Sequence, residues 1–342
     1  MGNYVEIYKM KNKIIVVRNV LGLLVLSVLG ACSSGSSSSS GSSINLDGDA
    51  SLTVSVTDSP IDEASRVVIE FNGVTLKGAG DGSPSIVIEF NQPKVIDLLS
   101  LQGPNSQLLL DAASIPSGDY QWIRLQVTAN GIYTPPVAGD FDGHGVGSYL
   151  ERDNGSGGTE KIPLKVPSGS QSGLKLVGNF TASDKGETAF TIDFDLRQMI
   201  NGPFSPGASE YYELLPEMRM IDTDAGGHIS GFIDPTLLED NAGCLGSQPE
   251  DLEGVAVYVF DAMATVGDIQ SNSGPITTAL VSYENDAYKY AFGFLEAGEY
   301  KLALSCDAEL DNSNQDDAIV FFPEIDQVFV EAGLTTPVDI TN

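Results

Sequence analysis

Residues 51–56 read SLTVSV, in which apolar and small polar side chains alternate. Successive side chains of a β-strand point to opposite faces, so this alternation predicts a strand with one buried and one solvated face. The same habit recurs at residues 121–127 and 190–194, between clusters of Gly, Pro, Asn and Asp. Residues 97–101 and 195–200 could form single helical turns, but no long segment follows the helical period. We therefore predict an all-β protein built from antiparallel strands.

A break in this pattern falls at residues 222–227, which read DTDAGG. Strand patterning restarts at residue 228 and continues through about seven short strands in about 115 residues, which is typical of an immunoglobulin-like or prealbumin-like sandwich. We predict two antiparallel β-sandwich domains, at residues 49–222 and 226–342. A single domain without a break is the alternative, and it fits the chain length less well.

The N-terminus carries basic residues followed by an apolar stretch, VLGLLVLSVL, at residues 20–29. This stretch is too short to span a bilayer, which requires about 20 residues, but it has the length of a signal-peptide core. It ends in LGAC at residues 29–32, which resembles the bacterial lipobox. The resemblance implies that residues 1–31 are a lipoprotein signal peptide and that Cys32 is diacylated and palmitate-bearing. The alternative is an ordinary signal peptide that releases the protein into the periplasm or medium.

Residues 33–43 read SSGSSSSSGSS and have nothing to bury, so we expect a flexible spacer. We assign residues 32–48 to the lipidated cysteine and this Ser/Gly tether. Two acyl chains would anchor the chain stably, where one would not. Ser33, in place of an aspartate after the cysteine, resembles the outer-membrane sorting pattern of Gram-negative lipoproteins. We therefore expect a protein anchored by lipid to the outer membrane, on its periplasmic or its exposed face.

The composition is strongly acidic, with 17 Lys and Arg against 47 Asp and Glu and a formal net charge of −30. A surface of this sign repels nucleic acid and anionic lipid. We expect no nucleic-acid partner, and a bilayer contact that depends on the lipid of Cys32 rather than on charge. The charge favours cation binding only in general terms, and adaptation to salty surroundings explains it more simply.

The chain has three cysteines, and the predicted lipid occupies Cys32. In an exported protein the remaining pair, Cys244 and Cys306, predicts a disulfide in the second domain. Residues 300–306 read YKLALSC, which places Cys306 on the same strand face as the apolar residues and hence toward the core. The alternative is a pair of buried free thiols.

Three phrases in the first block point to a known family. They are TDSP at residues 57–60, VIDLLSLQG at residues 95–103 and IPSGDYQWIRL at residues 115–125. In this order after a lipobox they resemble the bacterial lipoprotein family called domain of unknown function 4382, over about residues 50–197. The family has no assigned activity, so the resemblance implies an exported β-rich domain and no particular ligand.

The second block contains the phrase GFLEAGEYKL at residues 293–302. It is similar to a carboxypeptidase-regulatory or prealbumin-like β-sandwich module. A turn with glycine leads into a strand whose tyrosine packs at the sandwich edge, and residues 115–122 fit the same description. The pattern supports an architecture and not an activity.

Two acidic clusters are candidate calcium sites, because calcium takes six to eight hard oxygen ligands. The first, DFDGHG, begins at residue 140, and the second follows Cys306. Neither matches the EF-hand loop, and Asp-rich turns are also common in solvated loops without metal. We expect no other cofactor. The candidate ligands are Asp140, Asp142, Asp307, Asp311 and Asp316.

Catalytic motifs are scarce in the sequence. His144 and His228 are the only histidines, and there is no Gly-x-Ser-x-Gly elbow and no glycine-rich phosphate loop. Paired carboxylates for glycoside hydrolysis always exist in so acidic a chain and therefore carry little information. We predict that the protein is not an enzyme, with an enzyme of unassigned type as one alternative.

Tyr120 and Trp122 are candidate ligand-binding residues. They alternate with Ile123 and Leu125, so they should occupy the opposite face of that strand. An exposed aromatic pair could stack on a sugar or a peptide. The alternative is that a loop or the second domain covers both side chains.

Together these features predict a membrane-anchored, non-enzymatic envelope lipoprotein that acts as a binding or structural module. Loops on a rigid β-scaffold would form its contact surface. The second hypothesis is a glycan-binding or glycan-processing accessory lipoprotein that uses Trp122. A protein or a glycan remains open as the ligand.

Overall fold

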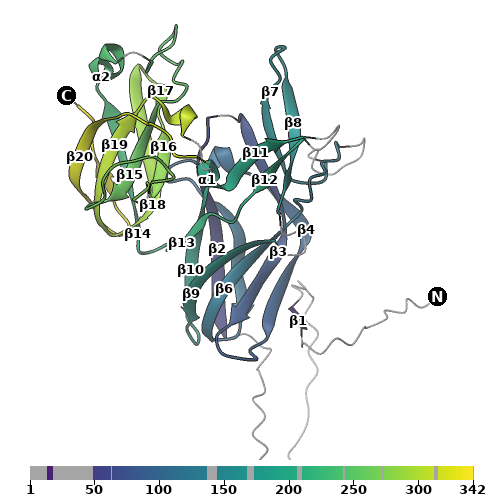
Figure 1. Ribbon diagram of the computed structural model, residues 1–342. Coiled ribbons are helices and arrows are strands. Elements are labelled where there is room, and N and C mark those ends of the chain that lie inside the picture. The colour runs from purple at the N-terminus through teal and green to yellow at the C-terminus, as the bar shows by residue number, and fades with distance from the viewer. Residues whose placement is uncertain are drawn as a thin grey trace, which may run out of the picture.

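The computed structural model confirms the prediction of an all-β fold (Figure 1). Its strands form two groups of sheets. We call the sheets formed by residues 50–222, together with residues 14–17, the N-terminal sandwich, and those formed by residues 226–337 the C-terminal sandwich. Cys32 and most of the predicted signal peptide and tether lie outside the described residues. The structure describes residues 14–17, 49–62, 64–136, 145–167, 173–205, 210–241, 243–271, 273–311 and 315–341.

The larger sheet of the N-terminal sandwich has the order β1-β4-β3-β7-β8-β12-β11, and β6 joins β3 to β9. Its strand β1 pairs in parallel with β4 and belongs to the segment predicted as signal peptide. The strands are β1 (Ile14–Val17), β3 (Arg66–Gly78), β4 (Ser85–Asp97), β6 (Gly118–Val127), β7 (Tyr149–Asp153), β8 (Thr159–Lys165), β9 (Leu174–Ala182), β11 (Ile200–Phe204) and β12 (Tyr211–Leu214).

The second sheet of the N-terminal sandwich has the order β13-β10-β2-β5, in which β2 and β10 run parallel. On β2 the apolar members of residues 51–56 are buried and the polar members are partly exposed, as the alternation predicts. Phe71 and Phe194 join the two sheets through an edge-to-face contact with ring centroids 6.1 Å apart. The strands are β2 (Ala50–Ser59), β5 (Gln107–Ile115), β10 (Glu187–Asp195) and β13 (Met218–Asp222).

In the part of the chain that the structure describes, helical segments are only three to six residues long. Two of them fall where the sequence predicts them, and the Asp195 carboxylate caps the second by accepting a hydrogen bond from the Gln198 backbone N–H at 3.2 Å. The turns are η1 (Leu98–Leu101), α1 (Leu196–Met199), α2 (Pro235–Asp240) and η2 (Ala308–Leu310). Among the described residues, no helix is long and apolar enough to cross a membrane.

The C-terminal sandwich packs two four-stranded sheets around one hydrophobic cluster. Their orders are β17-β18-β14-β21 and β16-β15-β19-β20. The strands are β14 (Gly226–Ile233), β15 (Ala256–Asp261), β16 (Thr277–Leu280), β17 (Ser282–Glu284), β18 (Ala287–Glu296), β19 (Gly298–Ser305), β20 (Phe321–Val330) and β21 (Thr335–Pro337).

A disulfide joins Cys244 and Cys306, as the sequence predicts, with Cα atoms 4.8 Å apart. Cys306 directly follows β19, and both cysteines are buried within the core cluster. The bridge therefore fastens the segment after α2 to the inner face of the neighbouring sheet.

The same tyrosine contact closes one edge of each sandwich. The Tyr120 hydroxyl donates to the Pro116 carbonyl oxygen at 2.6 Å, and the Tyr300 hydroxyl donates to the Glu296 carbonyl oxygen at 2.7 Å. In both cases the acceptor lies four residues earlier, just before a Gly-acidic-Tyr strand start. A buried tyrosine that returns its hydroxyl to the preceding turn is a recurrent feature of β-sandwiches.

The two sandwiches contact each other through buried polar groups. Arg197 of α1, which lies between them in Figure 1, forms an ion pair with Asp62 at 2.7 Å and donates to the Ala308 carbonyl oxygen. Nearby, a Cβ atom at Gly293 would lie 2.0 Å from the Gly103 carbonyl oxygen. Glycine is therefore required where β18 approaches the loop after η1.

Candidate functional site

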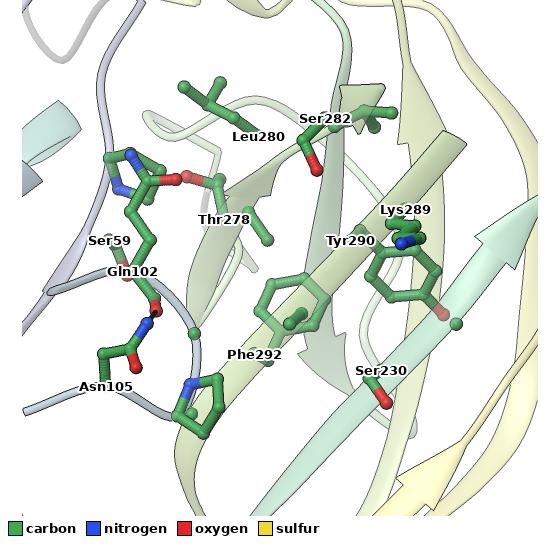
Figure 2. A pocket seen from close by; sticks show the side chains of 18 of the residues that line it. Ser59, Gln102, Asn105, Ser230, Thr278, Leu280, Ser282, Lys289, Tyr290 and Phe292 are labelled. Carbon is green, nitrogen blue, oxygen red and sulfur yellow. Dashed lines mark hydrogen bonds between the residues drawn. The ribbon is translucent and has the colours of Figure 1, made fainter. Parts of the chain in front are cut away.

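A cleft of about 700 Å³ lies where the two sandwiches meet. The N-terminal sandwich contributes the end of β2, residues 102–105 and Asp193 of β10, and the C-terminal sandwich contributes residues of β14, β16, β17, β18 and β21. In Figure 2, Gln102 and Asn105 lie across the cleft from Lys289 and Tyr290, with Phe292 between them. Clefts at domain junctions are common ligand sites, because two scaffolds there supply different groups to one space.

The wall from the N-terminal sandwich is fastened by Thr57, in the phrase TDSP. Its hydroxyl lies 2.9 Å from the Leu101 carbonyl oxygen and 2.7 Å from that of Asn105. The Asn105 side-chain amide donates to the Gln102 carbonyl oxygen at 2.9 Å. These contacts hold the backbone of residues 101–105, which carries Gln102 and Asn105, at the cleft. Two of the family phrases therefore meet in space and build one wall.

The floor is the outward face of β14 and β18. Ser230 lies opposite Ala291 in the antiparallel register, and Phe232 lies opposite Lys289. Small side chains thus leave room in the middle, while Phe232, 53% exposed, forms an aromatic rim. A large aromatic ring exposed on the solvated face of a strand is typical of an interaction site.

Tyr290 lines the cleft from the buried side of β18. Its hydroxyl donates to the Val338 carbonyl oxygen at 2.6 Å. Burial raises the pKa of this phenol, so it stays protonated and acts as a fixed donor. Tyr290 therefore shapes the cleft but does not supply an acid or base to it.

The charged residues that line the cleft are mainly acidic, and most have partners. Lys289 is the only cation among these residues, and it pairs with Glu284 at 3.8 Å. Asp193 pairs with Arg219, and Asp339 accepts a hydrogen bond from the Phe232 backbone N–H at 2.9 Å. The lining therefore offers no unpaired positive charge.

Asp58, the second residue of TDSP, is an exception. Neither of its buried carboxylate oxygens has a hydrogen-bond partner among the described residues. Burial, reinforced by the charges of Asp193 and Asp195, raises the pKa of Asp58 well above its usual value. Burial also raises the pKa of Asp195 to about 6. Both carboxyls therefore keep their protons to a higher pH than an exposed aspartate does.

The candidate calcium residues are only partly brought together. Asp140 and Asp142 lie outside the described residues. Asp311 joins two carboxylates that the sequence analysis did not select, Asp268 and Asp317, and the three offer oxygen atoms within 4.8 Å of one another. The other two candidates, Asp307 and Asp316, are not part of this group.

The carboxylates of this cluster already accept hydrogen bonds from the protein. Asp311 accepts from the Ile269 backbone N–H at 3.1 Å and from the Tyr258 hydroxyl at 3.0 Å. Asp268 accepts from the Asp317 backbone N–H at 2.6 Å. Burial raises the pKa of Asp311. The cluster thus joins two loops, and by itself it does not define a cation site.

The prediction that Tyr120 and Trp122 occupy the same face of their strand is wrong. Tyr120 is only 3% exposed and stacks on Phe180 with ring centroids 4.9 Å apart. Between Trp122 and Tyr120, the strand pairing moves by two residues along β6 but by only one residue along β3. Such a bulge turns the side chain before it to the opposite face.

Trp122 remains on the outer face, partly buried. Arg124 and Lys175 lie over its ring at 4.9 and 5.0 Å from the ring centroid. These cation–π contacts cover the indole with the protein's own side chains. The aromatic platform expected from the sequence is therefore reduced to one ring that already has partners.

Of the two histidines, His144 lies outside the described residues. His228 packs edge-to-face against Phe294, and its Nδ1 accepts from the Phe294 backbone N–H at 3.3 Å. Burial lowers the pKa of this imidazole. His228 therefore supports the turn between β18 and β19 rather than the cleft.

Gln102, Asn105 and Phe232 line the cleft and were not predicted from the sequence. A signal existed for two of them. Gln102 lies within the family phrase VIDLLSLQG, and Phe232 is a large aromatic residue in a polar position of HISGFI at residues 228–233. What the sequence could not show is that these segments face each other across two sandwiches.

The fold and the cleft define an all-β protein of two sandwiches with a shared groove. Residues 49–216 match the family model of domain of unknown function DUF4382, and this part of the chain belongs to that family. The match includes the TDSP wall and ends before β13. The C-terminal sandwich lies outside it.

No curated protein matches the sequence. Among solved structures, the TIE protein of Bacillus anthracis is 7% identical, with a TM-score of 0.16, over 85% of this chain and 34% of that chain. This chain thus spans about a third of that protein. A candidate adhesin from Bacteroides ovatus ATCC 8483 is 8% identical, with a TM-score of 0.20, over 91% of this chain and 99% of that one. Neither likeness is close enough to define the fold.

Proposed function

We propose that the protein is a non-enzymatic binding module of the bacterial envelope, anchored to the outer membrane through Cys32, and that the cleft between its sandwiches holds the ligand. The observation that carries this proposal is the cleft itself. Each sandwich supplies a different wall, and hydrogen bonds from Thr57 fix the loop that carries Gln102 and Asn105. A groove of about 700 Å³ has the size of small-ligand sites in proteins.

The chemistry of the lining supports binding over catalysis. Among the described residues that line the cleft, Lys289, Asp193 and Asp339 have partners within the protein, and none is a histidine or a cysteine. General acid–base catalysis needs a titratable group free to exchange a proton with substrate, and nucleophilic catalysis needs a nucleophile beside a base. Among these described residues, Asp58 is the one charged lining residue without a partner, and its carboxyl is buried.

The anchoring part of the proposal rests on the sequence. Cys32 ends a signal-like segment, and a Ser/Gly spacer follows it. We expect the full chain to sediment with outer membranes and to carry acyl mass on Cys32. A Cys32→Ser variant should move to the soluble fraction. An unmodified Cys32 in a protein that is soluble without the substitution would contradict anchoring.

The cleft is tested separately by blocking it. Ser282 is exposed and lines the cleft, whereas Thr335 is exposed on β21 at the other edge of the same sheet and does not line it. We would add sets of glycans, peptides and small amines to the full chain and measure thermal shift and hydrogen exchange. A ligand of the cleft should protect residues 102–105, and Ser282→Trp should abolish this effect while Thr335→Trp keeps it. Equal effects of the two variants would contradict the cleft as the site.

A further inference from the structure

We propose that the ligand of the cleft is an uncharged oligosaccharide, which stacks on Phe232 and is hydrogen-bonded by Gln102 and Asn105. This inference rests on the proposed function and names the chemical class that the cleft recognises. It also places the glycan site at the junction of the sandwiches rather than on the β6 face that carries Trp122.

The charged groups that line the cleft are mainly acidic. Asp58, Asp193, Glu284 and Asp339 line the cleft, and Lys289 is the only cation among the lining residues. Its ammonium group already faces Glu284 at 3.8 Å. A phosphate, sulfate or uronate group would meet acidic neighbours without a free cation to pair with it. The lining therefore disfavours anionic ligands.

The polar groups of the cleft match those of a sugar. Each sugar hydroxyl both donates and accepts, so a protein site for it needs groups of both kinds. Gln102 and Asn105 carry amides with one acceptor and two donor hydrogens each, and Ser230 and Ser282 add hydroxyls. The Thr278 hydroxyl, labelled in the wall in Figure 2, is buried and has no hydrogen-bond partner among the described residues. Such a group favours a ligand that can hydrogen-bond it.

An exposed aromatic ring forms the rim of the cleft. Phe232 is 53% exposed and points outward from β14 beside the small residues Ser230 and Ala291. The C–H face of a pyranose ring is apolar, and an aromatic ring can bury it at the edge of a polar groove. Because Ser230 and Ala291 are small, there is room beside the exposed Phe232 ring for a pyranose to stack on it.

An extended peptide fits less well. A peptide bound by strand addition needs an open strand edge with exposed main-chain groups. One edge strand beside the cleft is β16, whose residues Thr277, Thr278 and Ala279 are only 3–4% exposed. Its edge is covered by the N-terminal sandwich through the contact of Thr277 with Ser59. The edge strands of the other sheet, β17 and β21, are more exposed but offer only three residues each.

The test is an array carrying neutral gluco-, manno-, galacto- and xylo-oligosaccharides, sulfated and uronate-containing glycans, and peptides. The detergent-solubilised full chain is applied, and hits are followed by calorimetry. Phe232→Ala is compared with Phe329→Ala, a matched control on β20 that is 57% exposed and does not line the cleft. Thermal melting confirms that each variant is folded, and Asn105→Ala, at an exposed loop position, provides a second test.

We expect binding to neutral oligosaccharides only. Phe232→Ala should weaken it about tenfold, which corresponds to about 1.4 kcal/mol, and Asn105→Ala should weaken it severalfold. Phe329→Ala should change the affinity less than twofold. Sensitivity to Phe232→Ala without sensitivity to Phe329→Ala would support the stacking role.

The outcomes separate this inference from the proposed function. If charged glycans or peptides bind instead, and both Phe232→Ala and Ser282→Trp lose this binding, the neutral-glycan inference is overturned and the cleft remains the site. Neutral-glycan binding lost in Trp122→Ala but kept in Phe232→Ala would overturn the inference and the cleft assignment together. A folded chain that binds no member of the array would overturn the inference, and the absence of any ligand-induced protection of the cleft would then also overturn the proposed function.

Discussion

The two sandwiches have similar strand architecture, but different contacts stabilise them. The N-terminal sandwich buries one continuous hydrophobic cluster, from Ala50 to Met218, and contains no cysteine. The C-terminal sandwich is shorter and buries a smaller cluster, from Ile229 to Ile340, which includes the disulfide. Small domains bury a smaller fraction of their surface and rely more on cross-links. The disulfide in the sandwich with the smaller core fits this tendency.

Removing the disulfide should have the largest effect, and it should act on one sandwich only. The bridge has a sequence separation of 62, for which the chain-entropy model gives about 4 kcal/mol of stabilisation. We expect Cys244→Ala with Cys306→Ala to lower the free energy of unfolding by about this amount. Hydrogen exchange should show faster opening in β14–β21 and little change in β2–β13. Equal acceleration in both sandwiches would show that they unfold as one unit.

The next largest effect should come from Arg197, which links the two sandwiches. Although burial disfavours its charge, the ion pair with Asp62 holds the pKa of Arg197 above its usual value. Their side chains are 5% and 7% exposed, so Arg197→Ala would leave a buried carboxylate unpaired. We expect a loss of about 3 kcal/mol by chemical denaturation.

The matched control is Arg152→Ala. Arg152 pairs with Glu160 and Glu210, but its side chain is more accessible to solvent. We expect a loss below about 1 kcal/mol. Losses of similar size for the two arginines would contradict the role assigned to burial at the junction.

The buried acids of the N-terminal sandwich should make its stability depend on pH. Because the folded-state pKa values of Asp58 and Asp195 are raised, the folded state keeps protons that the unfolded state releases above about pH 4. Stability should therefore fall as the pH rises from 4, through about 6 for Asp195 and further for Asp58.

The variant Asp58→Asn isolates one of these groups. Asparagine cannot ionise, so the variant should gain up to about 1.4 kcal/mol relative to the native chain for each pH unit between the unfolded and folded pKa values of Asp58. Denaturation at pH 5, 6 and 7 measures this difference. Parallel pH profiles for the two proteins would mean that Asp58 does not hold its proton.

The smallest changes in stability should come from two tyrosine hydroxyls, one in each sandwich, and the two changes should be equal in size. Tyr120→Phe and Tyr300→Phe each remove one buried-edge hydroxyl that donates to a carbonyl four residues earlier. We expect each to cost about 1 kcal/mol in thermal unfolding. Tyr283→Phe, at a 3.4 Å contact on the surface, should change stability by less than about 0.5 kcal/mol. A large effect at only one corner would show that the two turns are not equivalent.

The comparison also shows where sequence reasoning works. The alternation at residues 51–56, the position of Cys306 on the core face and the tyrosine turns are local patterns, and the structure matches them. Tyr120 was misplaced because the bulge in β6 is a property of its pairing with β3, which the strand's own residues do not reveal. Asp268 was missed because it joins Asp311 from a different loop.

The sequence by itself determined the strand class of the chain, the disulfide pair and the family phrases, because side-chain alternation and turn chemistry act over a few residues. The sequence also predicts a lipid anchor at Cys32, and fractionation of the cell envelope would test this prediction. Only the tertiary structure decided that TDSP and residues 102–105 meet β14 and β18 in one cleft. That meeting depends on how two sandwiches pack through Arg197 and Gly293, and such long-range contacts have no local signature in the chain.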